Sequence, residues 1–441
     1  MGSSFFQEKP LEELVDVYDS LRKPVTASDR KPGPYPYYGA SGITDYVDSF
    51  IFDGEYLLLS EDGDNLRTQN TPIAFMATGK FWVNNHAHIL QANANNCTKY
   101  VCNALQIADV TSYISGSTRP KLNQKDMRRI LVYAPPLPEQ RAIAHILGSL
   151  DDKIELNRRM NETLEGMAQA LFKSWFVDFD PVIDNAIVAG NAIPEELADR
   201  AEVRRAALAN GTANREAAKP FPARFQQTEE LGWIPFGWEV GPVLRQAKLL
   251  SGGTPKTSED SYWDGHIKWA SAKDVSQCGK AFLTETERTI TQEGLDNSST
   301  KVIPRFSTVI VSRGATTGRM AMFGDDIAMN QTCYALRFNT GHHFYGYCHA
   351  RHFIDSLVQT AHGSVFDTIT TKTFESSNVI LASSATSGLF ENAVQSLFGR
   401  ILTNEHATQS LTKLRDTLLP KHISGELRIP DAEKLAESAL A

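Results

Sequence analysis

The second part of this sequence repeats the first. When the 441-residue chain is shifted by 247 residues, positions 116–171 align without a gap on positions 363–418. Ten positions are identical: Gly116/Gly363, Ser117/Ser364, Lys125/Lys372, Val132/Val379, Ser149/Ser396, Leu150/Leu397, Ile154/Ile401, Asn157/Asn404, Leu164/Leu411 and Leu171/Leu418. Solenoid repeats have much shorter periods, of roughly 20–50 residues. The repeat therefore predicts a duplicated domain with two-fold pseudosymmetry.

An apolar stripe with a seven-residue step runs through each copy. It comprises Ile143, Leu150, Asn157, Leu164 and Leu171 in the first copy, and Phe390, Leu397, Asn404, Leu411 and Leu418 in the second. Such a step is typical of a coiled-coil seam, although an amphipathic helix packed on its own domain is an alternative. The central asparagine favours the seam, because a seam asparagine costs stability and fixes register. Antiparallel pairing would bring Asn157 and Asn404 close together.

Short β-branched and aromatic runs precede each long helix. Strands are expected near residues 46–52, 55–60, 81–84, 88–91, 130–133, 267–270, 308–312 and 333–338, with a helix near 98–107. The prediction is an α+β fold in which two β-rich globular domains are joined by two long helices forming an antiparallel coiled coil. The expected divisions are 1–135, a long helix within 136–180, a linker at 181–231, 232–382, a second long helix within 383–425, and a tail at 426–441.

Composition limits the class of protein. With 41% hydrophobic and 22% charged residues, the chain has the balance of a soluble globular protein. No run approaches the ~20 apolar residues of a membrane span, and no signal peptide opens the chain, so a cytoplasmic protein with no membrane contact is expected. The net charge of −8 argues against indiscriminate nucleic-acid binding. A DNA-binding role would need a local basic face or help from other subunits.

Common catalytic signatures are absent from the sequence. It contains no phosphate-binding loop, dinucleotide fingerprint, nucleophile elbow or His-Glu-x-x-His motif. A zinc site is conceivable where histidines gather, at His342, His343, His349 and His352 with Cys348. The aromatic residues between them favour a packing helix, so we expect no metal site. The five cysteines are scattered and indicate neither disulfides nor a zinc ribbon.

Polar and basic residues between the expected strands are the candidates for contact with DNA. Arg, Lys, Asn and Gln recognise base edges, whereas Ser and Thr more often hold phosphates. The candidates are Tyr37, Tyr38, Arg67, Thr68, Asn84, Asn85, His86 and Arg119 in the first half, and Lys256, Lys273, Arg313, Thr316, Thr317, Arg319, Asn330 and Gln331 in the second. At any single position, a solvated loop residue is the simpler interpretation.

Several motifs resemble one protein family. They are Leu137-Pro138-Glu139-Gln140-Arg141, Leu150-Asp151-Asp152-Lys153-Ile154, Trp175-Phe176-Val177-Asp178-Phe179, Gly116-Ser117-Thr118-Arg119-Pro120, Gly232-Trp233-Ile234-Pro235, Ser251-Gly252-Gly253-Thr254-Pro255 and Leu419-Pro420-Lys421-His422-Ile423. Together they resemble the specificity subunit of type I restriction-modification systems, over nearly the whole chain. The second copy departs at Ala385-Thr386-Ser387, where Pro138-Glu139-Gln140 has no counterpart.

The resemblance implies a non-catalytic subunit. Two target-recognition domains would each bind one half of a bipartite double-stranded DNA site, and the paired helices would dock modification subunits, two of them expected, together with restriction and translocase subunits. S-adenosylmethionine, ATP and Mg²⁺ would belong to those partners, with no cofactor in this chain. Two alternatives stay open: a catalytic DNA-modifying enzyme, and a duplicated protein-binding scaffold that does not contact DNA.

Overall fold

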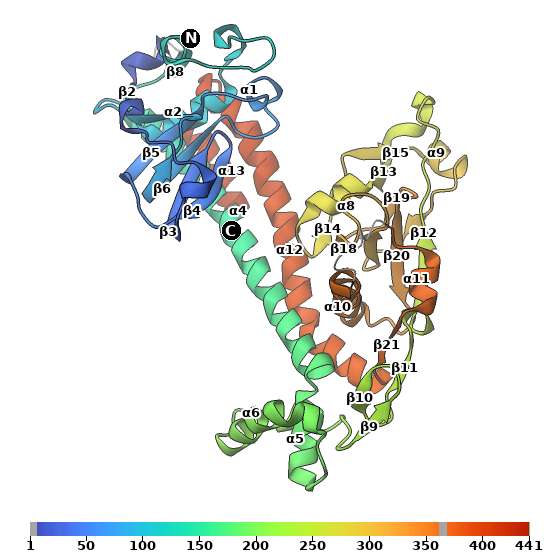
Figure 1. Cartoon of the computed structure of the whole chain (residues 1–441). Helices are drawn as coiled ribbons and strands as arrows, with labels where there is room; N and C mark the ends of the chain where they lie inside the picture. The colour runs from blue at the N-terminus through green and yellow to red at the C-terminus, as the bar shows by residue number, and fades with distance from the viewer. Residues whose placement is uncertain (1–6, 361–367, 441) are drawn as a thin grey trace. The chain divides into compact units, whose positions relative to one another are not determined.

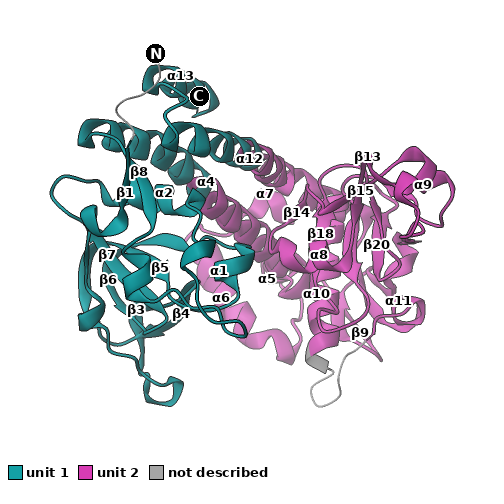
Figure 2. Ribbon diagram, turned by 90° about the horizontal axis from the view of Figure 1, so that it is seen from above, with its two compact units in different colours: residues 1–155, 408–441 teal, residues 156–407 magenta. Residues whose placement is uncertain are grey.

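The computed structural model describes residues 7–360 and 368–440, which fold into two compact units. The first unit contains residues 1–155 and 408–441, and the second contains residues 156–407 (Figure 2). The repeated pair Gly363 and Ser364 lies outside the described residues. In the described ranges, no helix combines the length and the apolar character that crossing a membrane requires.

The first unit is built around one mixed sheet of six strands. Its elements are β1 (Gln7–Pro10), β2 (Val15–Val17), β3 (Pro32–Gly39), β4 (Gly42–Val47), β5 (Phe52–Ser60), α1 (Asn65–Thr68), β6 (Ala74–Val83), β7 (Ala87–Ala92), α2 (Thr98–Ile107), α3 (Gln124–Met127), β8 (Leu131–Ala134) and α13 (Ile429–Leu440). The sheet order is β2-β7-β5-β6-β3-β4, and β1 pairs separately with β8. Leu57, Leu59 and Leu90 on the sheet pack with Tyr100 and Leu105 of α2 in one buried cluster.

The second unit divides its strands between a five-stranded and a four-stranded sheet. Its elements are α5 (Asp180–Ala189), α6 (Ala198–Ala209), α7 (Arg215–Ala218), β9 (Phe225–Thr228), β10 (Gly232–Pro235), β11 (Glu239–Pro242), β12 (Ala247–Ser251), β13 (Trp263–Ala270), α8 (Ala272–Cys278), β14 (Phe282–Leu283), β15 (Arg288–Ile290), α9 (Gln292–Asp296), β16 (Val302–Ile303), β17 (Thr308–Val311), β18 (Met320–Phe323), β19 (Ile327–Met329), β20 (Cys333–Phe338), α10 (His343–Thr360), α11 (Thr371–Ser376) and β21 (Asn378–Leu381). The sheet orders are β12-β20-β17-β18-β14 and β15-β13-β19-β16, beside the pairs β10-β9 and β11-β21.

The duplication is visible in the order and pairing of the elements. In the first unit β1 pairs antiparallel with β8, and in the second β11 pairs in the same way with β21. The three-strand order β2-β7-β5 of the first unit corresponds to β12-β20-β17 of the second. Asn123 caps α3 and Thr370 caps α11, each accepting a hydrogen bond from the backbone three residues on. These caps are 247 residues apart, so the repeat found in the sequence is a repeat of structure.

Two long helices, α4 (Leu137–Phe172) and α12 (Ser384–Ile423), contribute a segment to each unit (Figure 1). In the first unit, Arg415 Nη1 lies 2.9 Å from Asp151 Oδ1. In the second, Asn161 Nδ2 donates to Glu405 Oε1 at 2.8 Å. Going from Asp151 to Asn161 along α4, the contacted residue on α12 changes from Arg415 to Glu405, so the two helices run in opposite directions. The predicted antiparallel pair of long helices is therefore confirmed, and the first continues through a π-helical turn at Lys173–Val177.

The buried face of α4 does not keep a strict seven-residue step. Leu150, Asn157, Asn161, Ala168 and Phe172 are all buried, which gives alternating steps of seven and four. A straight helix turns about 20° away from a heptad stripe in each heptad. Leu164 and Leu171 are consequently only half-buried. The same holds for Leu397, which is half-buried, while Ile143, Phe390, Leu411 and Leu418 are fully packed.

An asparagine contact lies in the second unit between the helices, although with a different pairing from the expected one. Asn404 Nδ2 donates to Asn161 Oδ1 at 2.8 Å, and both side chains are buried. Asn161 lies one helical turn beyond Asn157 on α4, so the helices are offset by about one turn from the end-to-end alignment. Asn157 itself is buried.

The linker and the tail are ordered helical segments. The predicted linker at 181–231 holds most of α5, all of α6 and α7, and the strand β9. Arg200 Nε donates to Asp180 at 2.6 Å and Arg204 Nε to Asp184 at 2.8 Å, which ties α6 to α5. The tail forms α13, whose Ala432 and Ala436 are buried in the core of the first unit. Small residues there allow the helix to approach closely.

Candidate nucleic-acid interface

In both units, polar loops follow the strand ends, and equivalent backbone hydrogen bonds hold these loops. We call this set of backbone contacts the loop frame. In the first unit, the Glu61 amide donates to His86 O at 2.9 Å. In the second, the Ser312 amide donates to Thr332 O at 2.8 Å. A single β-bridge follows in each case, between Asp62 and Lys121 and between Arg313 and Thr368. Asp62 and Arg313 therefore occupy equivalent positions, with opposite charges.

A side-chain-stabilised turn is also repeated. The Oδ1 atom of Asn84 accepts the His86 amide at 2.8 Å, and that of Asn330 accepts the Thr332 amide at 3.1 Å. Asparagine favours such turns because its side chain mimics a backbone acceptor. The neighbouring Asn85 and Gln331 are exposed. The sequence candidates Asn84-Asn85-His86 and Asn330-Gln331 are thus equivalent loops, and the inner asparagine of each has a structural role.

In the first unit three candidate side chains come together around residues 116–119. Arg67 donates to Gly116 O at 2.6 Å and to Ser117 O at 3.0 Å. Gly116 has φ of +84°, and a Cβ there would lie 2.4 Å from Arg119 O. Only glycine fits such a turn. Asp62 Oδ2 then lies 2.9 Å from His86 Nδ1 and 3.2 Å from Arg119 Nη2. Thr68 is exposed beside Arg67.

Beneath this loop lies a buried ionic network. His88 is 1% exposed, with Nδ1 at 2.6 Å from Asp19 Oδ2 and Nε2 at 2.8 Å from Leu122 O. Both contacts are hydrogen bonds only when both ring nitrogens carry protons. Arg22 Nη1 lies 2.5 Å from Glu61 Oε2. Burial raises the pKa of Asp19, but the hydrogen bond and charge of His88 outweigh it with the Ile89 amide and Arg22, so that pKa is lowered.

Three residues of this network are of types that can bind a metal ion. Asp19, Glu61 and His88 are grouped closely enough to share an ion. However, His88 already contacts an acceptor through each ring nitrogen, and Arg22 supplies positive charge beside both carboxylates. A metal ligand must offer a free lone pair. These residues therefore fit an ion-pair network and do not fit a metal.

The second unit presents its cations differently. Lys256, Arg313 and Arg319 are exposed, and none has a carboxylate at ion-pair distance within residues 7–360 and 368–440. Thr316 is exposed and Thr317 is half-buried in the same turn. Gly252 lets the loop after β12 approach β19, because a Cβ there would lie 2.2 Å from Asn330 O. Thr254 donates to Gln331 across that approach.

Three candidates lie in surroundings that weaken their assignment. Tyr37 is 1% exposed, and its hydroxyl bonds the Val25 backbone, so it belongs to the core and its candidacy is withdrawn. Tyr38 is half-buried against Phe75 and Phe81, and burial raises its pKa. Lys273 Nζ lies 2.7 Å from Glu287 Oε2, and that hydrogen bond raises the lysine pKa.

Sequence reasoning missed the acidic residues that organise the first cluster. Glu61 and Asp62 follow directly after a buried apolar strand, which was a visible signal. The candidates from sequence were basic, amide, hydroxyl and histidine side chains, because acidic groups repel phosphate. Glu61 also pairs with Lys121 at 3.2 Å. Glu61 and Asp62 therefore form ion pairs with neighbouring cations, and these pairs are visible only in the folded structure.

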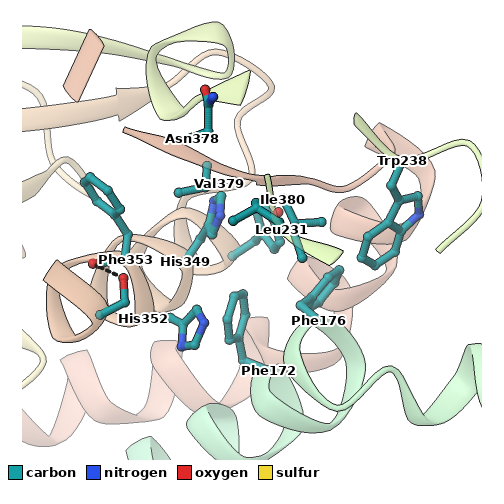
Figure 3. Close-up of a pocket in the computed structure, with 12 residues that line it drawn as sticks. Phe172, Phe176, Leu231, Trp238, His349, His352, Phe353, Asn378, Val379 and Ile380 are labelled. Atoms are coloured by element: carbon teal, nitrogen blue, oxygen red, sulfur yellow. Dashed lines mark hydrogen bonds between the residues drawn. The ribbon is translucent and has the colours of Figure 1, made fainter. Parts of the chain in front are cut away.

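The histidine-rich segment forms the helix α10, as the packing interpretation predicted. Its His349 and His352 line an aromatic pocket of about 240 Å³ together with Phe172, Phe176 and Trp238 (Figure 3). His349 is 5% exposed, and burial lowers its pKa to about 4. Burial raises the pKa of the Cys348 thiol. The imidazole of His349 is therefore neutral near pH 7 and packs as part of the core.

Comparisons with known proteins agree with this architecture. The family described as type I restriction modification DNA specificity domain matches residues 4–166 and 237–413. The specificity subunit of type I restriction enzyme HindI from Haemophilus influenzae is 28% identical over 404 residues, covering 85% of this chain and 84% of that protein. The MjaIX specificity subunit from Methanocaldococcus jannaschii is 24% identical over 444 residues, covering 96% and 94%.

A solved structure shares the fold. The S subunit of a type I restriction-modification system from M. genitalium has a TM-score of 0.58 at 14% identity, covering 96% of this chain and 97% of that chain. The two family matches correspond to the two copies of the repeat and together span more than half of the sequence. The chain therefore belongs to the type I restriction modification DNA specificity family.

Proposed function

We propose that this chain is the sequence-recognition and assembly subunit of a type I restriction-modification complex. Each unit would bind one half of a bipartite double-stranded DNA target. The observation that carries the proposal is the repeated loop frame: equivalent strand ends present polar side chains at Asp62 and Arg313, and at Asn85 and Gln331. Similar frames with different side chains are what two related but distinct half-sites require.

The paired helices are proposed to dock modification subunits, with two copies matching the two-fold repeat. The restriction and translocase subunits would join that assembly. Methyl transfer from S-adenosylmethionine and ATP-dependent steps with Mg²⁺ would take place in those partners. This assignment is supported by the lack of catalytic motifs in the sequence. In this proposal the present chain supplies specificity and carries out no chemical step.

A domain exchange tests the proposal. Residues 232–381 are replaced by the equivalent unit of a relative, and the chain is coexpressed with its modification subunits. A randomised duplex library is then incubated with S-adenosylmethionine, and methylated sites are sequenced. One block of the target should change while the other block is retained. Retention of both blocks, or a motif that depends on neither unit, would contradict the division of recognition between the units.

The same experiment separates the remaining functions. A protein-binding scaffold would give assembly without any preferred duplex sequence. A catalytic enzyme would bind labelled S-adenosylmethionine as the isolated chain, and mixing with modification subunits would not be needed for methyl transfer. Binding of duplex DNA should be measured at a stated low salt concentration, because phosphate contacts weaken steeply with salt.

A further inference from the structure

One carboxylate in the first unit connects three separate loops. Asp62 follows β5, His86 lies between β6 and β7, and Arg119 lies between α2 and α3. The Asp62 side chain is 15% exposed and contacts His86 Nδ1 at 2.9 Å and Arg119 Nη2 at 3.2 Å. Its backbone forms a β-bridge with Lys121. The loop that carries Arg119 is therefore held both by its backbone and by the Asp62 side chain.

The two side chains held by Asp62 retain outward-facing groups. The Arg119 side chain is 72% exposed and that of His86 is 40% exposed. Asp62 accepts from Nδ1, so neutral His86 carries its proton there and leaves Nε2 as an acceptor. An acceptor suits the exocyclic amino group of adenine or cytosine, whereas the remaining guanidinium donors of Arg119 suit guanine or phosphate.

We propose that Asp62 is a positioning residue for DNA recognition by the first unit, acting through His86 and Arg119. This inference rests on the proposed function and adds a residue that does not itself contact DNA. The sign of its effect distinguishes positioning from simple charge. A carboxylate near phosphates opposes binding, so its removal would tighten binding if charge alone mattered. Positioning requires the opposite: weaker and less selective binding.

The second unit supplies an internal comparison for the inference. Its equivalent residue is Arg313, and no carboxylate among the described residues pairs with that side chain. Asp62 contacts both His86 and Arg119, so the two units differ at this position. Loss of Asp62 should therefore affect one half of the target only.

The test compares Asp62→Asn with Asp64→Asn, each in the full complex with modification subunits. Asp64 is exposed in the same loop, and its side chain does not cap α1. The control therefore removes the same charge but leaves the contacts of Asp62 with His86 and Arg119 in place. Methylated sites from a randomised duplex library give the preference at every position. For Asp62→Asn, discrimination in one block should fall on the order of tenfold at one or more positions, with the other block unchanged. Asp64→Asn should keep both blocks.

A second variant keeps the proposal testable if Asp62→Asn does not fold. Arg119→Ala alters a 72% exposed side chain, so the fold should be retained, and the same block should lose discrimination. Tighter binding with unchanged selectivity in folded Asp62→Asn would overturn the proposal. An unchanged motif in Arg119→Ala would also overturn it. If the wild-type complex selects no sequence at all, the proposed function itself fails, which is a distinct result.

Discussion

The two units carry equivalent loops, but the residues that pack next to these loops differ. In the first unit, the loop after β5 rests on a buried network in which Asp19, Glu61, Arg22 and His88 are mutually paired. In the second unit, the loop after β17 follows Val309, Ile310 and Val311, which are buried among apolar side chains. The first loop therefore carries cations paired with carboxylates, and the second carries exposed cations that have no carboxylate partner among the described residues.

The buried histidines show the same contrast. His88 in the first unit contacts an acceptor through each ring nitrogen, whereas His349 in the second is neutral and its Nδ1 atom has no hydrogen-bond partner among the described residues. Charged networks orient side chains at the cost of desolvation, while apolar packing leaves surface groups mobile. We infer that the first unit contributes mainly orientation and the second mainly electrostatic attraction. Four measurements test this difference between the units.

The largest expected effect is on the buried network. Asp19→Asn should destabilise the first unit by about 3 kcal/mol near neutral pH, because it removes a buried carboxylate that pairs with Arg22 and contacts His88. The lowered pKa of Asp19 means that its contribution is present above the ordinary value of 3.8 and is lost as pH falls below it. Denaturant unfolding at several pH values measures this, with the exposed Asp16→Asn as control. Equal destabilisation by the two variants would show that the buried network does not contribute to the stability of the first unit.

The second expected effect concerns the neutral histidine. The lowered pKa of His349, about 4, means that the unfolded chain binds a proton first as pH falls below 6.5. Stability of the second unit should therefore decrease by about 2 kcal/mol between pH 6.5 and 5. His349→Phe should flatten that dependence, and the exposed His266 replaced by phenylalanine should not. If the stability of His349→Phe still decreases to the same extent between pH 6.5 and 5, another group causes the decrease.

The third effect is on DNA affinity. Removing both Arg313 and Arg319 should weaken binding on the order of tenfold and lower the slope of log affinity against log salt by about 2, since each phosphate contact contributes about 0.9. Arg313→Ala alone and Arg67→Ala are the matched single changes, and the Arg67 guanidinium is held by two backbone carbonyls. The salt slope should change less in Arg67→Ala than in Arg313→Ala. Equal slope changes would show that these contacts of Arg67 do not limit its contribution to DNA binding.

The smallest effect is expected at Lys273. Its ammonium group pairs with Glu287 on the surface, and both side chains are more than half exposed. Lys273→Ala should leave the melting temperature unchanged, because exposed pairs contribute little. The salt slope should change less than in Arg313→Ala. A slope change as large as that of Arg313 would mean that Lys273 exchanges Glu287 for phosphate when DNA binds.

The duplication, the α+β class, the long helices and the family could all be predicted from the amino-acid sequence. Periodicity and repeated motifs are local signals, so strands such as β17 and β20 and the helix α2 appear where alternation and helical spacing predicted them. The predicted strand at 46–52 instead contains the bend between β4 and β5. Short apolar runs do not specify where a chain turns, because the turn depends on how the neighbouring strands pair.

Only the tertiary structure decided which polar residues meet. Asp62, His86 and Arg119 are far apart in the sequence. Asp62 and His86 converge because β5 and β7 are neighbours in one sheet, and the bridge between Asp62 and Lys121 brings Arg119 to them. The burial of Tyr37 and the pairing of Asn404 with Asn161 depend in the same way on contacts across the fold. Residue type gives the chemistry that a side chain can perform. Its partners, and therefore its charge and orientation, are set by packing between segments that are distant in the chain.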